Sequence, residues 1–240
     1  MQRFYINYLE LWEKNLFLEE AWLVHQLVKV LRSKNWDELS LFNWKEHKDY
    51  IYKIVNIEKR GIFVDLVKVE NRDWEIDFEL SLYQSLPNKL DKIEYIIQKW
   101  VEVWFTKFIF FRSNRSQELR WLTDSKIERF KKIIIEAVEQ SWRTIIPEIE
   151  FIKKIDSSTL KEEKNIFFHT EDNNSSLIKN LDISTFGNNI NLFVWPEWGF
   201  DDKEVAEFEE SNFSRVHLWN RILRTETTWI VTWFYIVQSK

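Results

Sequence analysis

Two patterns of hydrophobic and polar positions divide the 240-residue chain. In about the first seventy residues, short apolar runs alternate with polar turns, which is typical of closely spaced β-strands and favours a small barrel. The strand-like runs lie at 3–6, 37–42, 49–58 and 61–69. A helical stretch over 19–32 interrupts them, and we interpret its His25 as a packing or solvated residue.

Beyond this region, strand-like and helix-like segments alternate, which argues for a mostly parallel α/β sheet. Helices are predicted from an Asn88 cap through Val101, over 125–141 and over 225–238, because apolar side chains recur there at helical spacing. The strand candidates are 77–85, 107–113, 165–169, 191–194 and 215–218. The polar segment 70–74 separates the two patterns, so we predict one domain over 1–73 and another over 74–240.

The stretch 191–202, NLFVWPEWGFDD, contains an unusual turn. It predicts a strand, a tight turn and then a helix in which Asp201 is the N-cap and Glu204 its reciprocal partner. A turn of this kind usually requires glycine, yet Trp195 and Trp198 stand there.

Tryptophan occupies other positions where turn chemistry predicts glycine. Trp36 and Trp44 follow Asn between apolar runs, where Asn-Gly would make a hairpin turn. Trp104 and Trp142 come at the ends of helical patterns, where a glycine in the left-handed conformation is the commonest stop. The chain has 3 Gly and 14 Trp, whereas average usage would give about 17 Gly.

We interpret most of these tryptophans as glycines in the organism, written as Trp because UGA codons were translated with the wrong genetic code. Some bacterial lineages read UGA as glycine, and others read it as tryptophan. The alternative is a truly Trp-rich protein. It meets an energetic objection, because a bulky residue in a glycine-only conformation costs about 1–3 kcal/mol, and ten such sites would exceed a total stability of about 5–15 kcal/mol.

Composition and charge narrow the class of protein. No apolar run is long enough to span a membrane, and the N-terminus lacks the pattern of a signal peptide. The absence of Cys fits a reducing cytoplasm, and the four His have no metal-ligand spacing. Net charge is −5, but from 107 to 132 eight basic residues face three acidic ones, which indicates either a local phosphate-binding face or solvated helix surfaces.

Motifs over almost the whole chain resemble the RsmE family of 16S rRNA uridine-N3 methyltransferases, in the SPOUT superfamily. The N-terminal MQRFYI, then HQLVKVLR and the NWDEL turn, follow the family in order. IIQKWVEVWFTKF resembles the family's IIQKATELGV, and EAVEQSWRTIIPEI resembles EAAEQSGRNRVPEI. With glycine at the doubtful positions, VWPEWGF and LWNRILRTET become VGPEGGF and LGNRILRTET. The departures are Trp104, Trp142, Trp195, Trp198 and Trp219 at family glycines, and Trp100, Trp229 and Trp233 where small residues are expected.

The resemblance implies an α/β fold in which a SPOUT-type trefoil-knotted, mostly parallel sheet follows an N-terminal PUA-like β-barrel. S-adenosylmethionine would lie in the knot, held largely by backbone groups, and a literal Trp198 or Trp219 would fill its pocket. The implied cofactor-binding residues are Val194, Trp195, Pro196, Glu197, Trp198, Gly199, Leu218, Trp219, Asn220, Ile222, Leu223, Thr225 and Glu226.

The implied reaction is methyl transfer to N3 of uracil. A guanidinium beside the uracil oxygens would stabilise the anion that this attack requires, and the resemblance points to Arg221 and, more weakly, Arg224. Glu197 and Glu226 are nearby carboxylates for a base or a cofactor contact. The alternative for Arg224 and both glutamates is an ion pair that fixes the loop.

The implied partners are 16S rRNA or the small ribosomal subunit and a second copy of the chain, with no membrane and no metal. The expected phosphate contacts are Arg3, Lys29, Arg32 and Lys34, extended by Arg112, Arg115 and Arg143. Three competing hypotheses stay open. They are a related knotted methyltransferase acting on another base or on tRNA, a non-catalytic RNA-binding module of the same fold, and a defective product if the tryptophans are literal.

Overall fold

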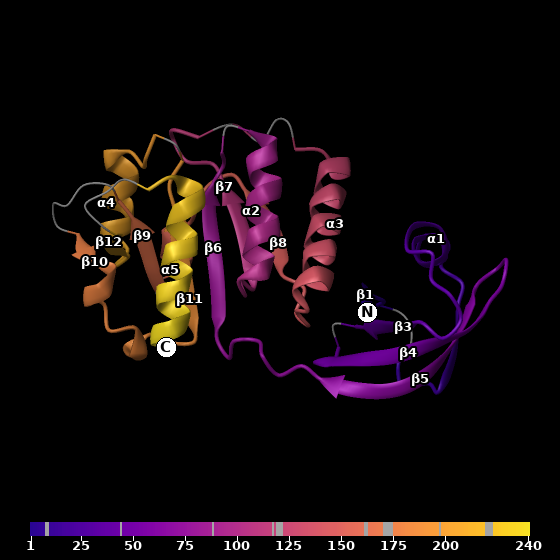
Figure 1. The fold of residues 1–240 in the computed structure, drawn as a ribbon. Coiled ribbons are helices and arrows are strands. Elements are labelled where there is room, and N and C mark those ends of the chain that lie inside the picture. Colours follow the sequence, from indigo (N-terminus) through magenta and orange to yellow (C-terminus); the bar gives the residue numbers. More distant parts are fainter. Residues whose placement is uncertain are drawn as a thin grey trace. The chain divides into compact units, whose positions relative to one another are not determined.

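We analysed a computed structural model of the chain, drawn in Figure 1. The structure describes residues 1–7, 10–43, 45–87, 89–116, 118, 122–160, 163–169, 175–196, 198–218 and 223–240, together with the backbone but not the side chain of Leu90. The contacts divide the chain into two compact units. The first contains Met1–Glu75 and Val138–Ile146, and the second contains Ile76–Ala137 and Pro147–Lys240.

The first unit is built on a five-stranded sheet with the order β1-β3-β4-β5-β2. Its strands are β1 (Gln2–Tyr5), β2 (Asn15–Leu18), β3 (Glu38–Phe42), β4 (Lys48–Ile57) and β5 (Ile62–Asn71). Only the β1–β3 pair is parallel among the described strands. Helix α1 (Ala21–His25) continues as a π-helical segment, η1 (Gln26–Val30), and packs Leu23 and Leu27 into the core of the sheet.

The second unit is built on a seven-stranded sheet with the order β10-β12-β9-β11-β6-β7-β8, in which every described pair is parallel. Its strands are β6 (Glu79–Ser85), β7 (Lys107–Phe111), β8 (Glu148–Ile152), β9 (Lys164–Phe168), β10 (Ser176–Leu177), β11 (Asn189–Val194) and β12 (Ser214–His217). The expectation of a mostly parallel α/β sheet beside a separate small sheet is therefore confirmed.

Helices cover both faces of the parallel sheet. Helices α2 (Leu90–Glu102) and α5 (Thr225–Ser239) lie on one face, as Figure 1 shows, where Trp100 stacks on Phe110 and meets Trp229 edge to face. Helix α4 (Asp202–Glu210) covers the other face, and its Phe208 contacts Phe167 and Phe193. Each strand contributes side chains to both faces, because successive side chains point in opposite directions.

The positions where helices begin and end agree with the sequence predictions, except at the start of α2. The Asp201–Glu204 capping box is present as predicted. The N-cap of α2 is Lys89, which makes no side-chain capping bond, so the prediction of an Asn88 cap is wrong in position; Asn88 itself lies outside the described residues. Helix α3 (Asp124–Ser141) spans the predicted helix at 125–141. The described residues also form three short 3₁₀ turns: η3 (Ser157–Leu160), η4 (Ile178–Asn180) and η5 (Ile183–Thr185).

Three of the tryptophans adopt the left-handed backbone that favours glycine. Trp36, Trp104 and Trp142 have φ of 81°, 61° and 62°. At Trp142 the next amide, that of Arg143, donates to the Val138 carbonyl at 3.2 Å, which is the long bond of a Schellman helix stop. The predicted glycine-like conformation at these positions is therefore confirmed. Trp195 is not among the described residues with a left-handed φ, and Trp44 lies outside the described residues.

Candidate functional site

Three segments lie at one edge of the parallel sheet, namely loop 113–116, loop 194–200 and the segment from Leu218. Because its described strands run in the same direction, β6, β7, β11 and β12 all end at this edge. Loop 113–116 follows β7, loop 194–200 leaves β11, and the segment from Leu218 follows β12. Ligands of open α/β sheets bind outside the carboxyl ends of the strands, so this edge is where a site is expected.

Loop 194–200 makes a close turn at Gly199. The Gly199 amide donates to the Pro196 carbonyl at 2.9 Å, and its φ of +74° is left-handed. A Cβ added at Gly199 would meet nothing within 4 Å, so the main chain here is open to a ligand. Trp195 and Pro196 are buried, and the Trp195 carbonyl accepts a hydrogen bond from the Thr225 hydroxyl at 2.8 Å.

The Trp198 side chain is largely accessible to solvent. It is 78% exposed, and the expectation that a literal Trp198 would fill the cofactor pocket stays a prediction. The related expectation for Trp219 falls outside the described residues.

The start of α5 contributes to the same edge. Arg224 is the N-cap residue, with an exposed side chain, and its carbonyl accepts hydrogen bonds from the amides of Thr227 and Thr228. Thr225 is buried, while Leu223 and Glu226 are half-buried. Leu218 is buried at the end of β12. Arg221, Glu197, Trp219, Asn220 and Ile222 lie outside the described residues.

Loop 113–116 holds loop 194–200 and the start of α4 through several hydrogen bonds. Arg115 Nη1 donates to the carbonyls of Trp198 and Phe200, at 3.0 and 3.4 Å. The Asn114 amide donates to Glu204 Oε1, and Asn114 Nδ2 donates to Asp201 Oδ2, both at 2.8 Å. Sequence analysis placed Arg115 at an RNA surface and missed these contacts, because the partners are more than eighty residues apart.

The Asp201 carboxylate has a lowered pKa. The main cause is the hydrogen bond from the Glu204 backbone amide, and Asn114 and Arg115 lower the pKa further. Asp201 and Glu204 also complete the reciprocal capping box of α4, with N–H···O distances of 2.9 Å in both directions. The end of loop 194–200 is therefore held by hydrogen bonds to the Asp201 and Glu204 side chains.

A polar residue of the sheet interior, Gln84, was also missed. It is fully buried at the carboxyl end of β6, where it pairs in register with Val194 of β11. Its Nε2 donates to the Ser85 carbonyl, but its Oε1 has no hydrogen-bond partner among the described residues. The signal in the sequence was a lone Gln at the end of the apolar run LSLYQS.

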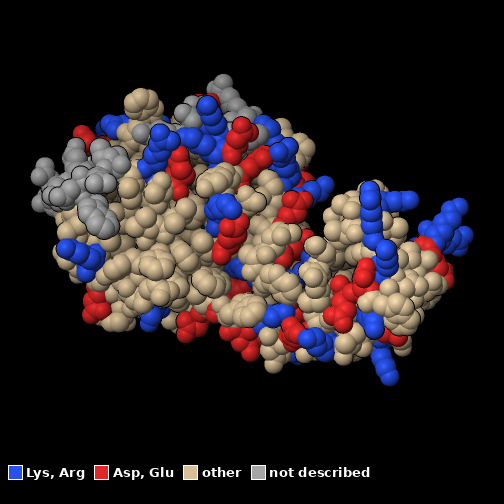
Figure 2. Space-filling view, in the orientation of Figure 1, with Lys and Arg blue, Asp and Glu red and all other residues tan. Residues whose placement is uncertain are grey.

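The predicted RNA contacts fall into exposed and buried groups. Lys29, Arg32 and Lys34 are exposed in the first unit. Arg112 is exposed and forms an ion pair with Glu118 at 3.5 Å. Lys107, Arg129 and Lys131 are also paired with acidic groups, and blue and red side chains lie side by side over α2 and α3 in Figure 2. The basic surplus of this segment is therefore partly neutralised.

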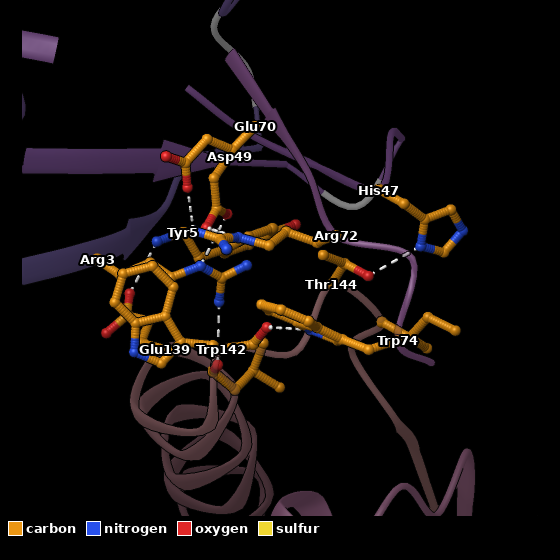
Figure 3. A network of polar contacts seen from close by, with 12 residues as sticks. Arg3, Tyr5, His47, Asp49, Glu70, Arg72, Trp74, Glu139, Trp142 and Thr144 are labelled. Carbon is orange, nitrogen blue, oxygen red and sulfur yellow. Dashed lines mark hydrogen bonds and ion pairs between the residues drawn. The ribbon is translucent and has the colours of Figure 1, made fainter. Parts of the chain in front are cut away.

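Arg3 and Arg143 are buried in the first unit. Arg3 Nε donates to Asp49 at 2.9 Å and its Nη1 to the Val138 carbonyl at 3.0 Å, as Figure 3 shows. Arg143 donates to Glu75 through Nε and Nη2, and burial lowers the pKa of both guanidinium groups. A phosphate contact would require these ion pairs to open, so neither residue belongs to the proposed RNA surface.

Further contacts place the segment Val138–Ile146 in the first unit. The Tyr5 amide donates to Glu139, and His47 Nδ1 lies 2.8 Å from the Thr144 hydroxyl. The Trp74 indole N–H donates to the Trp142 carbonyl at 3.3 Å (Figure 3). Sequence analysis assigned this whole segment to the second domain, because its partners lie far away along the chain.

Two negative findings limit the chemistry of the described residues. Within the described ranges, no three His, Asp or Glu side chains are grouped so that they could hold a metal ion. A search of the same residues found no helix with the length and apolar character needed to cross a bilayer.

Comparisons with known proteins identify the family. The profile of the RNA methyltransferase domain matches residues 75–237. A ribosomal RNA small subunit methyltransferase E from Buchnera aphidicola is 30% identical over 212 residues, which cover 86% of this chain and 81% of that protein. The protein of the same name from Rickettsia conorii is 30% identical over 230 residues, covering 94% and 90%.

A solved structure shows the same fold. The ribosomal RNA small subunit methyltransferase E of Neisseria gonorrhoeae, bound to S-adenosyl methionine, matches with a TM-score of 0.81. The two chains are 24% identical, and the match covers 99% of this chain and 96% of that one. From the domain profile and the two curated relatives, we conclude that this chain belongs to the small-subunit ribosomal RNA methyltransferase E family of RNA methyltransferases.

Proposed function

We propose that this protein transfers a methyl group from S-adenosylmethionine to N3 of one uridine in 16S rRNA. The observation that carries the proposal is that the matched domain, residues 75–237, contains the loops that gather at the carboxyl edge of the parallel sheet. The Neisseria protein with this fold binds S-adenosyl methionine, which supports the same cofactor here. A cytoplasmic location follows from an rRNA substrate.

In this proposal the cofactor is held by the loops 194–199 and 218–226. The fit is supported by the open main chain at Gly199, where no atom occupies the space of a Cβ. Thr225 ties the two loops together through the Trp195 carbonyl, which keeps their backbones close. S-adenosylmethionine, when bound, supplies a methyl group that is already activated by its sulfonium.

The C-terminal segments form a trefoil knot in this proposal. The strand order supports it, because β12, the last strand, lies between β9 and β10, which both precede it in the sequence. A strand inserted between two earlier neighbours is compatible with a knotted C-terminal segment and also occurs in unknotted sheets. True knots are rare in proteins, so the knot itself rests on the family resemblance.

The chain's own groups then have to position the uracil and stabilise its anion. Arg221 is the proposed guanidinium beside the uracil oxygens, and Arg224, exposed at the start of α5, is the second candidate. Removing the N3 proton leaves negative charge on the two flanking oxygens, and a fixed cation there lowers the barrier. Holding the two reactants in contact supplies much of the remaining rate.

RNA binding is assigned to the first unit, which we propose is a PUA-like barrel. Lys29, Arg32 and Lys34 lie on or just after the α1–η1 segment and are exposed, so their charges are accessible to phosphates. Arg112 extends this set in the second unit. The target uridine has to leave its stack to reach the site. Affinity for RNA should fall steeply with salt, because each phosphate contact releases counterions.

A homodimer is the proposed assembly. Helix α5 exposes Ile230 and Phe234, which are four residues apart and therefore lie on one face of the helix. Phe234 is 60% exposed, whereas Thr228, Trp229, Thr232 and Ile236 of the same helix are buried. Light scattering of the wild-type protein and of Phe234→Glu tests this face, and a variant that keeps the wild-type mass would contradict it.

The test of the function is methylation of small subunits that lack the modification. Purified protein, S-adenosylmethionine and 30S subunits are incubated, and the rRNA is digested for nucleoside mass spectrometry. The expected product is 3-methyluridine, and Arg221→Ala should lose it while still binding the cofactor. A different methylated base, or a product only on tRNA, identifies the related methyltransferase instead. RNA binding without cofactor binding identifies a non-catalytic module.

A further inference from the structure

Two loops at the carboxyl edge of the sheet are joined by side chains that come from one short segment. Asn114 and Arg115 of loop 113–116 make four hydrogen bonds to residues between Trp198 and Glu204. Two of the acceptors are backbone carbonyls and two are carboxylate oxygens. The contact therefore fixes both the path of loop 194–200 and the start of α4.

The supporting loop is itself firmly anchored. Ser113 is buried, and its hydroxyl lies 2.6 Å from the hydroxyl of Ser85 at the end of β6. The Ser113 amide donates to the Ser116 hydroxyl at 2.9 Å, and the Ser116 amide returns a bond to the Ser113 carbonyl at 3.1 Å. Asn114 and Arg115 thus project from a turn that is closed on itself and tied to the central strand.

The loop that they hold needs such support. Within loop 194–200, the turn bond from Gly199 to Pro196 is local, and glycine has the largest backbone freedom of any residue. Thr225 fixes the loop only at Trp195. The half from Trp198 to Phe200 is held by Arg115, whose two acceptors lie on either side of Gly199, and by the buried Phe200 ring, which lies against Phe111 and Phe208.

We propose that Asn114 and Arg115 are positioning residues, which hold loop 194–200 in the conformation that binds the cofactor. This inference rests on the proposed function, since it assigns loop 194–200 to S-adenosylmethionine. It also gives Arg115 a role different from the phosphate contact expected from the sequence. A guanidinium that spans two main-chain carbonyls restricts a loop, whereas a phosphate contact would leave the loop unchanged.

The chemistry of the two side chains suits this role. The planar guanidinium presents several N–H donors in fixed directions, so one Arg can serve two carbonyls at once. Lysine carries its three N–H donors on one flexible and strongly hydrated nitrogen, so it is expected to hold the two carbonyls less firmly. Asn114 offers a backbone donor and a side-chain donor to two different carboxylates. Replacing either residue should therefore loosen the loop without removing a group that touches the reacting atoms.

The experiment measures cofactor and RNA affinity separately in full-length protein. Titration calorimetry with S-adenosylmethionine compares the wild type with Arg115→Ala, Arg115→Lys and Asn114→Ala. We expect Arg115→Ala to raise Kd, and KM for S-adenosylmethionine, about tenfold with kcat little changed, because charged hydrogen bonds of this kind are worth on that order. Arg115→Lys should recover part of the loss. Lys154→Ala, which removes an exposed cation paired with Glu207 on α4, is the matched control and should leave Kd unchanged.

RNA binding provides the second arm. Arg112→Ala should weaken binding to 16S rRNA and reduce its salt dependence, while Arg115→Ala should do neither. If Arg115→Ala binds the cofactor like the wild type but loses RNA affinity, Arg115 is a phosphate contact and the inference is wrong. Thermal unfolding shows whether each variant is folded. If Arg115→Ala is unfolded, Asn114→Ala provides the test instead. If the wild-type protein binds no cofactor, the proposed function is wrong. If the wild type and Arg115→Ala bind the cofactor equally well, only the inference about Arg115 is wrong.

Discussion

The interiors of the two units differ in the polar groups that they bury. In the first unit the buried charges lie against opposite charges: Arg3 and Arg72 contact Asp49, and Arg143 contacts Glu75. In the second unit, large aromatic rings fill the space between α2, α5 and the sheet. There, the indole N–H groups of Trp100, Trp229 and Trp233 are buried without a hydrogen-bond partner among the described residues.

This difference bears on which residues belong to the protein in the organism. A buried donor left without a partner lowers the free energy of unfolding by about 1–3 kcal/mol. Natural selection would therefore be expected to remove three such donors. The three positions are also those where the family resemblance expects small residues. The first unit also buries polar atoms that have no partner among the described residues, namely Arg3 Nη2, Glu20 Oε2 and Ser40 Oγ, but none of them belongs to a tryptophan. The three indoles themselves therefore support the interpretation that many of the tryptophans are misread glycines, which stays a prediction.

Removing Glu75 should have the largest effect, because it leaves Arg143 buried without a counter-charge. Glu75 accepts hydrogen bonds from Arg143 and from the amides of Thr144 and Ile145. We expect Glu75→Ala to lower the free energy of unfolding by about 3–5 kcal/mol, measured by urea denaturation. Glu75→Gln keeps an acceptor and should lose less. Equal, small losses for both variants would show that the ion pair does not stabilise the first unit.

A substitution at Gly61 should have the next largest effect. A Cβ at Gly61 would lie 2.6 Å from the Leu18 carbonyl oxygen and 2.5 Å from the Phe17 ring, and the backbone oxygen cannot move away easily. Gly61→Ala should therefore destabilise the protein by about 1–3 kcal/mol. Gly187→Ala is the matched control, since nothing lies within 4 Å of its Cβ position, and it should be close to neutral. If the two alanines behave alike, the close packing at Gly61 is incorrect.

Replacing Trp36 by glycine should stabilise the protein. Trp36 has φ of 81° and is 68% exposed, so glycine would relieve the backbone while losing little packing. We expect a gain of about 1 kcal/mol in chemical denaturation. Asn212→Gly is the control at a similar φ of 62°, and its gain should be smaller because Asn tolerates this conformation. A loss of stability in Trp36→Gly would remove the energetic argument against tryptophan.

The same interpretation can be tested on the native protein without any variant. The codons at positions 36, 44, 104, 142, 195, 198 and 219 should be UGA, and peptides from the source organism should carry glycine there by mass spectrometry. UGG codons and tryptophan-containing peptides would show that the protein is truly Trp-rich. Cofactor binding by that protein would then have to be demonstrated directly.

Local patterns predicted most of the elements but few of the contacts at the site. Apolar periodicity located α2, α3 and α5, and the Asp201–Glu204 signal located the start of α4. Strand β2 was missed because only four residues, NLFL, stand between charged neighbours. Strand β8 was missed because two of its five residues, EIEFI, are glutamates, which are uncommon in a parallel strand.

Long-range partners explain the remaining differences. Nothing in the sequence near Arg143 indicates burial, because Glu75 lies 68 residues away. Likewise, the sequence indicates that Arg115 is a surface cation, and only the structure shows its contact with loop 194–200. The proposed catalytic Arg221 was reached only through the family resemblance and stays a prediction, since it lies outside the described residues. Pairing between distant loops is set by the topology of the sheet, which local periodicity does not encode.

The smallest expected effect contrasts Asp201, a half-buried carboxylate, with the buried carboxylates of the first unit. The pKa of Asp201 is lowered in the folded protein, mainly by the Glu204 amide and further by Asn114 and Arg115. A carboxyl group with a lowered pKa stabilises the fold above its unfolded pKa of about 4, and this contribution is lost as pH falls through the folded pKa. Solvent screening keeps the contribution small.

Carbon-detected NMR titration of the Asp201 carboxyl group measures this contribution at a single residue. In Asn114→Ala, the pKa of Asp201 should rise slightly toward its ordinary value, because one hydrogen bond to the ionised form is lost. Asp156 is the internal control: its pKa is lowered by hydrogen bonds from Ser158, which the variant leaves intact, so it should not move. An Asp201 pKa that also stays constant would mean that Asn114 does not contact this carboxylate in solution, and the link between loop 113–116 and the start of α4 would then depend on Arg115 and the Asn114 backbone alone.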